Sequence, residues 1–125
     1  MVQKRLLCPE RVRKIPQQFS WIDQRLVREG HIERLSHRAA ALYLFLVTVA
    51  DARGLSYYSD PGISRRLGME VGTLDNARQE LGRLGLLAYQ SPLYQVLDLE
   101  QQTPTSRPSG LYSLQQIFKQ IGEAL

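Results

Sequence analysis

Only a few residues of this sequence have side chains that could act as nucleophiles, metal ligands or proton carriers. The two histidines, His31 and His37, are six positions apart. They lie on either side of a predicted interruption between helices, so they do not share a helical face. Cys8 is the single cysteine, which excludes an internal disulfide and a cysteine-based zinc site. No carboxylates join the histidines at metal-ligand spacing. We expect no metal site and interpret Cys8 as an incidental, reduced thiol.

The acids and glycines in the middle of the chain have a structural interpretation. Glu70, Asp75 and Glu80 fall on one predicted helix, where a solvated face explains them better than acid–base catalysis does. We interpret the glycines at positions 68, 72, 82 and 85 as interruptions of predicted helices. None of them belongs to a phosphate-binding loop followed by lysine. The sequence therefore predicts a protein that is not an enzyme and that uses no cofactor.

The composition is that of one small domain with an excess of positive charge. Of the 125 residues, 43 % are hydrophobic, which provides a core, and the formal net charge is +4. Residues 1–38 hold nine Lys or Arg and four acids, so the N-terminal third supplies the excess. This charge permits a polyanionic partner.

Neither a targeting segment nor a membrane segment is expected. The opening residues MVQKRLLC are basic, but no apolar h-region follows them. The longest apolar run, from Ala39 to Ala50, is too short to span a bilayer. We expect a soluble, cytoplasmic protein.

The elements that would position a binding site begin with a basic arm. Residues 1–16 combine five cations with two prolines and indicate an extended arm. Ser20 is the expected cap of a first helix that starts at Trp21 and ends at Gly30, with Trp21 as a core anchor. The residues of this helix that we expect to face inward are Trp21, Ile22, Leu26 and Val27.

A long apolar helix should form the centre of the core. Ser36 is its expected cap and Arg53-Gly54 its expected end. Because the segment between them is apolar on nearly every face, we expect other elements to surround it. The aromatic-rich segment from Leu55 to Tyr58 predicts a short strand.

The stretch from Asp60 to Gly85 predicts two short helices joined by a tight turn. The first should start at Asp60-Pro61, with Asp60 as its cap, and end at Gly68. The second should run from Val71 to Arg83, before Gly85. Its expected core face is one stripe of residues at helical spacing: Leu74, Ala77, Leu81 and Leu84.

Two strands and a tail complete the expected organisation. Leu86–Gln90 and Leu93–Leu99 predict a hairpin around Ser91-Pro92. Residues 100–110 have the composition of a linker, and residues 111–125 predict an amphipathic helix. This helix either folds back on the domain or docks elsewhere, in this copy or in a partner. Its expected partner-binding residues are Leu114, Ile117, Phe118 and Ile121.

The segment SDPGISRRLGMEVGTLDNARQELGRLGLL resembles the winged helix-turn-helix family of DNA-binding domains. Its pattern of a capped helix ending Leu-Gly, a turn, and a second helix ending Leu-Gly-Leu-Leu before the wing carries the resemblance. The preceding segment, FSWIDQRLVREGHIERLSHRAAALYLFLVTVADARGLSYYSD, is most similar to N-terminal domains of plasmid and phage replication initiators and related mobile-element proteins. The resemblance covers residues 17–99. It implies an α+β fold with a three-helix core, a short strand and a hairpin wing.

The resemblance also implies a site on double-stranded DNA. The helix from Val71 to Arg83 would enter the major groove and the hairpin would touch the backbone or the minor groove. Such a protein would act in transcription regulation or in mobile-element replication or transposition. The implied contacts are Thr73, Asn76, Gln79 and Arg83 in the groove, Arg65 and Arg66 at phosphates, and Arg11, Arg13 and Lys14 of the arm as additional cations.

The sequence departs from the family pattern at three points. Glu70 stands where the family usually has a Ser or Thr cap, and Asp75 is expected to project beside the groove-facing residues. No Lys or Arg occurs between Arg83 and Arg107, so the wing offers DNA no cation. An alternative is therefore a protein–protein adaptor that recruits a partner through the winged helix and the C-terminal helix. Self-association through the C-terminal helix is a third possibility.

Overall fold

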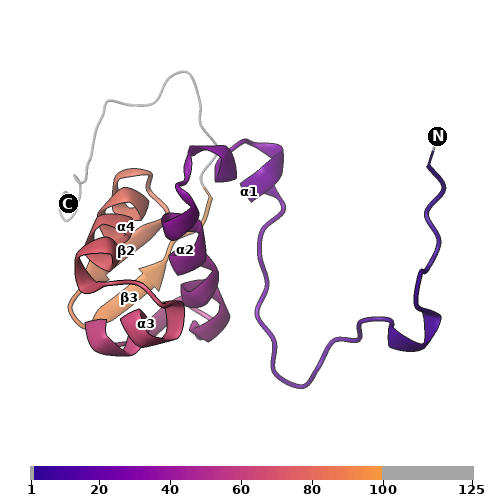
Figure 1. Cartoon of the computed structure of the whole chain (residues 1–125), viewed down its shortest axis with the longest axis horizontal. Coiled ribbons are helices and arrows are strands. Elements are labelled where there is room, and N and C mark those ends of the chain that lie inside the picture. The colour runs from indigo at the N-terminus through magenta and orange to yellow at the C-terminus, as the bar shows by residue number, and fades with distance from the viewer. Residues whose placement is uncertain (1, 100–125) are drawn as a thin grey trace.

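The computed structural model describes residues 2–99 of the chain, and these form an α+β fold (Figure 1). Four α-helices and a three-stranded antiparallel sheet make up this part of the chain, which confirms the expected class and is compatible with a winged helix. The predicted linker 100–110 and helix 111–125, with Leu114, Ile117, Phe118 and Ile121, lie outside the described residues. The elements are the 3-10 turns η1 (Pro9–Arg11) and η2 (Ile32–Arg34), the helices α1 (Arg25–Arg28), α2 (His37–Val49), α3 (Asp60–Leu67) and α4 (Val71–Arg83), and the strands β1 (Leu55–Tyr57), β2 (Leu87–Gln90) and β3 (Leu93–Val96).

The central helix is α2, and its cap is the one predicted. The Ser36 hydroxyl accepts a hydrogen bond from the Ala39 N–H at 3.1 Å. The helix ends at Val49, however, and not at Arg53, because the Asp51 carboxylate accepts the Arg53 and Leu55 amides in a turn before β1. Nor is α2 surrounded on every side, since Leu44 is 55 % exposed.

The two helices of the Asp60–Gly85 stretch form as predicted, apart from the first cap. The Ser59 hydroxyl, and not Asp60, accepts the Gly62 N–H, at 3.1 Å. Gly68 ends α3 in the left-handed conformation, which suits glycine (φ 65°), and α4 has the predicted bounds. Its core face is the predicted one: Leu74, Ala77 and Leu81 are buried, and Leu84 packs against them half-buried.

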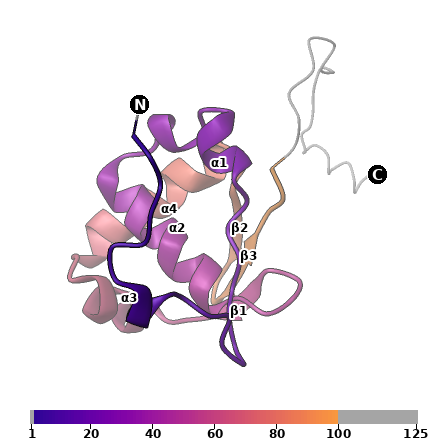
Figure 2. The ribbon, with the colours of Figure 1, turned by 90° about the vertical axis from the view of Figure 1, so that its right-hand side faces the viewer.

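The sheet has the strand order β1-β3-β2 and packs against the helices (Figure 2). Ser91-Pro92 joins β2 to β3, so the predicted hairpin forms with a two-residue loop, but β3 ends at Val96 and not at the predicted Leu99. Both pairings are antiparallel, and Tyr94 in the middle strand lies opposite Ser56 on one side and Tyr89 on the other. The Tyr94 side chain is fully buried, which places it between the sheet and the helices.

The first helix differs most from the prediction. The Ser20 hydroxyl donates to the Thr48 carbonyl at 2.9 Å and caps nothing, and α1 spans four residues only. The Asp23 carboxylate accepts both the backbone N–H and the guanidinium of Arg25, and these hydrogen bonds lower the pKa of Asp23 to about 2. Leu26 is buried as predicted. Trp21, Ile22 and Val27 are exposed, so Trp21 is no core anchor.

Among residues 2–99, no helix combines the length and the apolar character that a membrane span requires.

Replacing Ser36 tests how α2 is anchored. Besides capping α2, Ser36 donates from its hydroxyl to Glu80 at 2.8 Å and from its N–H to Glu80 at 2.7 Å. We expect Ser36→Ala to lower the free energy of unfolding by about 1–2 kcal/mol, because it removes the cap and one bond to α4. Urea denaturation followed by circular dichroism measures the change. Ser36→Thr, which keeps the hydroxyl, should recover most of the loss, and equal stability of Ser36→Ala and the parent would contradict this account.

Candidate nucleic-acid interface

The solvent-facing side of α4 carries a stripe of polar side chains. Asn76, Gln79 and Arg83 are exposed and follow one another at spacings of three and four residues, which aligns them on the side away from the core. Gly72 continues this stripe toward the start of the helix and is exposed as well. Thr73 is half-buried and lies at the edge of the stripe. We call Gly72, Asn76, Gln79 and Arg83 the α4 stripe.

Arginines stand at both ends of the α4 stripe. Arg65 and Arg66 are exposed in the last turn of α3, which the short turn after Leu67 places next to the start of α4. Arg83 lies in the last turn of α4, about 18 Å along the axis at 1.5 Å per residue. Within residues 2–99, no carboxylate pairs with any of these three guanidinium groups. They are therefore available to an external anion.

The predicted arm residues are not brought to the α4 stripe. Every side chain from residue 2 to residue 22 is exposed, and the arm extends outside the folded part of the chain (Figure 1). Arg11, Arg13 and Lys14 thus form a separate group of cations. Residues 23–99, here called the body, hold nine basic and nine acidic residues, whereas residues 2–22, here called the arm, hold five basic residues and one acid. The arm accordingly carries all of the net positive charge of the described chain.

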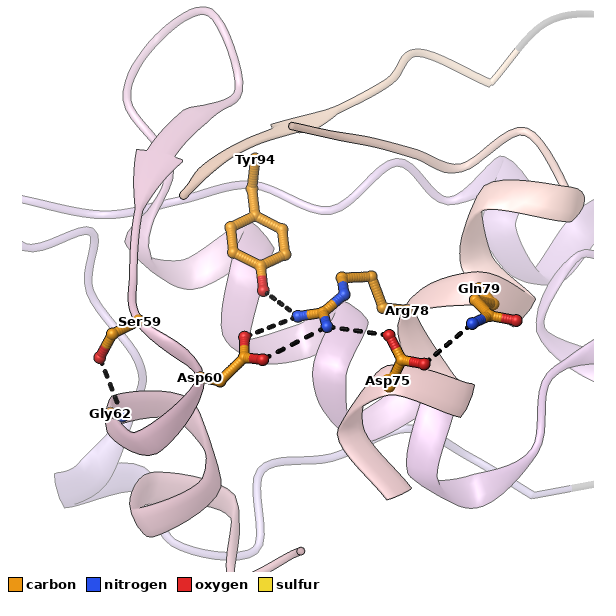
Figure 3. A network of polar contacts seen from close by, with 7 residues as sticks. All are labelled: Ser59, Asp60, Gly62, Asp75, Arg78, Gln79 and Tyr94. Carbon is orange, nitrogen blue, oxygen red and sulfur yellow. Dashed lines mark hydrogen bonds and ion pairs between the residues drawn. The ribbon is translucent and has the colours of Figure 1, made fainter. Parts of the chain in front are cut away.

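A buried arginine behind the α4 stripe ties α4 to α3 and to the sheet (Figure 3). One terminal nitrogen of Arg78 donates to Asp60 at 2.9 Å and to the Tyr94 hydroxyl at 2.8 Å. The other donates to Asp75 at 3.1 Å. The guanidinium also lies 4.2 Å from the centre of the Tyr89 ring, a cation–π distance. Four elements, α3, α4, β2 and β3, therefore meet at one side chain.

The charge of Arg78 is stabilised by its partners. Burial disfavours the charged form, but the hydrogen bonds to Asp60, Tyr94 and Asp75 outweigh it, so the pKa of Arg78 is raised. Burial also raises the pKa of the Tyr94 hydroxyl, although Arg78 partly offsets this rise. Arg78 is not among the site residues that the sequence predicts. The available signal is its spacing, because residue 78 lies four after Leu74 and three before Leu81, both of the core face.

Two of the acids predicted to lie on a solvated face are engaged in internal contacts instead. Asp75 accepts hydrogen bonds from Arg78, which it shares with Asp60, and, at 2.9 Å, from the Gln79 amide. Glu80 accepts both hydrogen bonds of Ser36. Glu70 is exposed at the cap position of α4 and makes no side-chain cap bond. Asp75 and Glu80 are therefore directed toward partners within the protein, whereas Glu70, among residues 2–99, stays free at the start of the helix.

The histidines lie apart from this face. His31 is buried, with its Nε2 atom 3.5 Å from a Glu29 carboxylate oxygen, and His37 is exposed at the first position of α2. In the part of the chain that the structure describes, no three His, Cys, Asp or Glu side chains gather into a group that could hold a metal ion.

No protein-family model matches this chain, and no curated protein and no solved structure matches it either.

The Arg78 network gives a test by double substitution. We expect Arg78→Met to lower the free energy of unfolding by about 2–3 kcal/mol, because Asp60 and Asp75 lose the cation between them. Asp60→Asn in the Arg78→Met background should then cost less than Asp60→Asn alone, a coupling that urea denaturation of the four proteins would measure. Arg78→Lys should restore part of the stability only, since an ammonium lacks the fork geometry. Additive effects of the two substitutions would rule out the network as a stabilising unit.

Proposed function

We propose that this chain is a non-enzymatic winged-helix protein that binds double-stranded DNA, with α4 in the major groove. The order α2, β1, α3, α4, β2, β3 and the three-stranded antiparallel sheet support this proposal. The observation that carries it is the α4 stripe, where uncharged polar side chains lie between Arg65 and Arg66 at one end and Arg83 at the other. The nearby carboxylates of Asp75 and Glu80 are held in hydrogen bonds within the protein.

Each exposed group of this face has a role suited to DNA. Asn76 and Gln79 have amides that can pair with an adenine edge, and Arg83 can reach a guanine or a phosphate. Arg65 and Arg66 would contact phosphates and set the orientation of the protein on the duplex. The Gln79 amide is already held by Asp75, which fixes the direction of its side chain before binding.

The arm would supply the long-range attraction. Because the body has no net charge, Arg11, Arg13 and Lys14 would contribute much of the phosphate neutralisation, together with the two arginines of α3. The resemblance to replication-initiator domains favours a role in transcription regulation or in mobile-element replication or transposition. This proposal involves no catalytic residue and no cofactor.

The proposed interface predicts a specific salt dependence. We expect Arg65→Ala/Arg66→Ala to weaken binding to duplex DNA roughly 10- to 100-fold at 0.1 M salt and to lower the slope of log K against log salt by roughly 1.8, because two phosphate contacts are lost. Fluorescence anisotropy titrations at several salt concentrations measure both quantities. The matched control is Arg28→Ala/Arg34→Ala, which removes the same charge from the exposed surface of α1 and η2. Equal effects of the two double variants would show that only net charge matters.

Gly72 allows binding to be separated from stability. A Cβ at Gly72 would meet no atom within 4 Å, and the residue lies in a helix, so Gly72→Ala should stabilise the fold by about 0.5–1 kcal/mol. The same methyl would stand where DNA approaches the start of α4, so affinity should fall several-fold. Gly82→Ala is the control, because Gly82 is exposed in the same helix about a quarter turn away from the stripe. A Gly72→Ala variant that is stabilised and binds DNA as tightly as the parent would contradict this placement of the DNA.

The adaptor function is the second candidate, and one observation favours it. The hairpin formed by β2 and β3 carries no charged side chain, and Tyr57 on the neighbouring strand is largely exposed. An uncharged sheet surface is better suited to a protein than to a phosphate backbone. The titrations above discriminate between the two functions, because an adaptor would show no salt-dependent binding to duplex DNA.

A further inference from the structure

The arm is rich in apolar side chains that nothing covers. Of the fourteen large hydrophobic residues that are exposed in the described chain, eight lie between Val2 and Ile22. Leu7 is 84 % exposed, Ile15 78 % and Trp21 72 %. A solvated tail is usually poor in such residues, because they gain nothing from water. The arm therefore has the composition of a segment that packs against another surface.

Neither the body of the same copy nor DNA accounts for these side chains. The arm is fixed at its root, where the Ser20 hydroxyl donates to the Thr48 carbonyl of α2, and the segment before it extends away from the body (Figure 1). Phosphates would satisfy its cations but would leave its Leu, Ile and Trp side chains in water. A second copy of the chain could cover them.

We propose that residues 2–22 form a dimerisation arm that docks on the body of a second copy, over the exposed side of α2 around Leu44. Leu44 lies one helical turn from Thr48, where the arm is fixed, and is half exposed although α2 is the central helix of the core. In a dimer with a twofold axis, an arm that leaves its own body beside this patch would reach the same patch of the other copy. Such a reciprocal contact closes into a dimer.

The area available matches that of a stable dimer. A fully buried apolar side chain removes about 60–120 Å² from water, as estimated from its transfer free energy. Eight side chains that average about two-thirds exposure would bury roughly 500 Å² in each arm. Two arms and the surfaces that they cover give roughly 2,000 Å², within the range of specific interfaces.

Charge disfavours contact between the two arms. Each arm carries five basic residues and one acid, so two arms packed against each other would repel, whereas the body has no net charge. Docking of arm on body is therefore favoured over docking of arm on arm. This inference does not rest on DNA binding, and its test contains no DNA.

Two native residues of the arm are built-in probes. Trp21 is the single tryptophan and Cys8 the single, exposed cysteine of the chain. In a dilution series of the full chain without DNA, the Trp21 emission should shift to the red as the mass by light scattering falls from twice 14.3 kDa to 14.3 kDa. Emission typical of water at every concentration, or a monomer throughout, would overturn the proposal.

Substitutions locate the interface. Trp21→Ser/Ile22→Ser and, separately, Leu44→Ser should give monomers with an unchanged circular dichroism spectrum, because all three side chains are exposed in one copy. Tyr57→Ser, which changes an exposed aromatic residue of the body outside the patch, should remain dimeric. Dimers in both interface variants, or loss of the dimer on Leu114→Ser/Ile117→Ser alone, would overturn the proposal and place association elsewhere.

Cross-linking determines which copy the arm covers. A photo-reactive maleimide on Cys8 of full chains, mixed as ¹⁴N- and ¹⁵N-labelled protein, should give cross-links from a light arm to α2 of a heavy body and the reverse. Mass spectrometry identifies these mixed pairs. Cross-links confined to pairs of one isotope would show that the arm folds back on its own body, which would exclude the proposed dimer.

Discussion

The burial of the Arg78 guanidinium is the interaction on which the arrangement of α3, α4 and the hairpin depends. Removing a cation from water is costly, and this cost is offset only while Asp60, Tyr94 and Asp75 keep their hydrogen-bonding geometry. The partners come from three different elements, so a shift of any one of them would break a short bond. The apolar contacts of Leu74 and Leu81 in the core have no preferred direction, whereas the hydrogen bonds of Arg78 require a defined geometry. The Arg78 network, on the buried side of α4, thus fixes the direction in which the α4 stripe faces solvent.

The same network changes the electrostatics of the exposed face. Asp75 faces the interior through one oxygen and holds the Gln79 amide through the other, which links the buried charge to the α4 stripe. Glu80 is bound to Ser36 at the start of α2. Within residues 2–99 no carboxylate pairs with Arg65, Arg66 or Arg83, so these cations are free near the ends of the stripe although the body as a whole has no net charge. Local pairing, and not the overall count, sets the potential that a ligand meets.

The sequence predicts correctly what neighbouring residues decide. The bounds of α4, the end of α3 at Gly68 and the cap at Ser36 all follow from signals within one or two turns. Two adjacent residues, Ser59 and Asp60, could cap α3, and the sequence favours Asp60. The Asp60 carboxylate instead accepts a hydrogen bond from Arg78, eighteen positions away, and Ser59 caps the helix. This choice depends on a tertiary contact that no local pattern reveals.

Exposure is likewise a property of the whole fold. Periodicity identifies Trp21 as apolar and suitably placed, but it cannot show whether another element covers it, and none does within the described chain. In the candidate site, too, local spacing predicts some features and the whole fold decides the others. Helical spacing predicts the exposed positions of Asn76, Gln79 and Arg83, but Thr73 is half-buried and Gly72 takes its place in the stripe. The contacts of Asp75 and Glu80 and the role of Arg78 required the three-dimensional arrangement.

The arm has a proposed role in DNA binding, through its cations, and in dimerisation, through its apolar residues, and the two roles are physically linked. A free arm would have to lose its conformational freedom at the moment of DNA binding, and this loss would subtract from the affinity. In the proposed dimer, apolar burial on the second copy orders the arm beforehand, while the long stems of Lys and Arg let their charged ends stay in water. The ordered cations then bind phosphates without that cost, and they give the electrically neutral bodies the positive charge that they lack. Dimerisation and DNA binding would therefore reinforce each other, because the segment that joins the copies also carries the net charge.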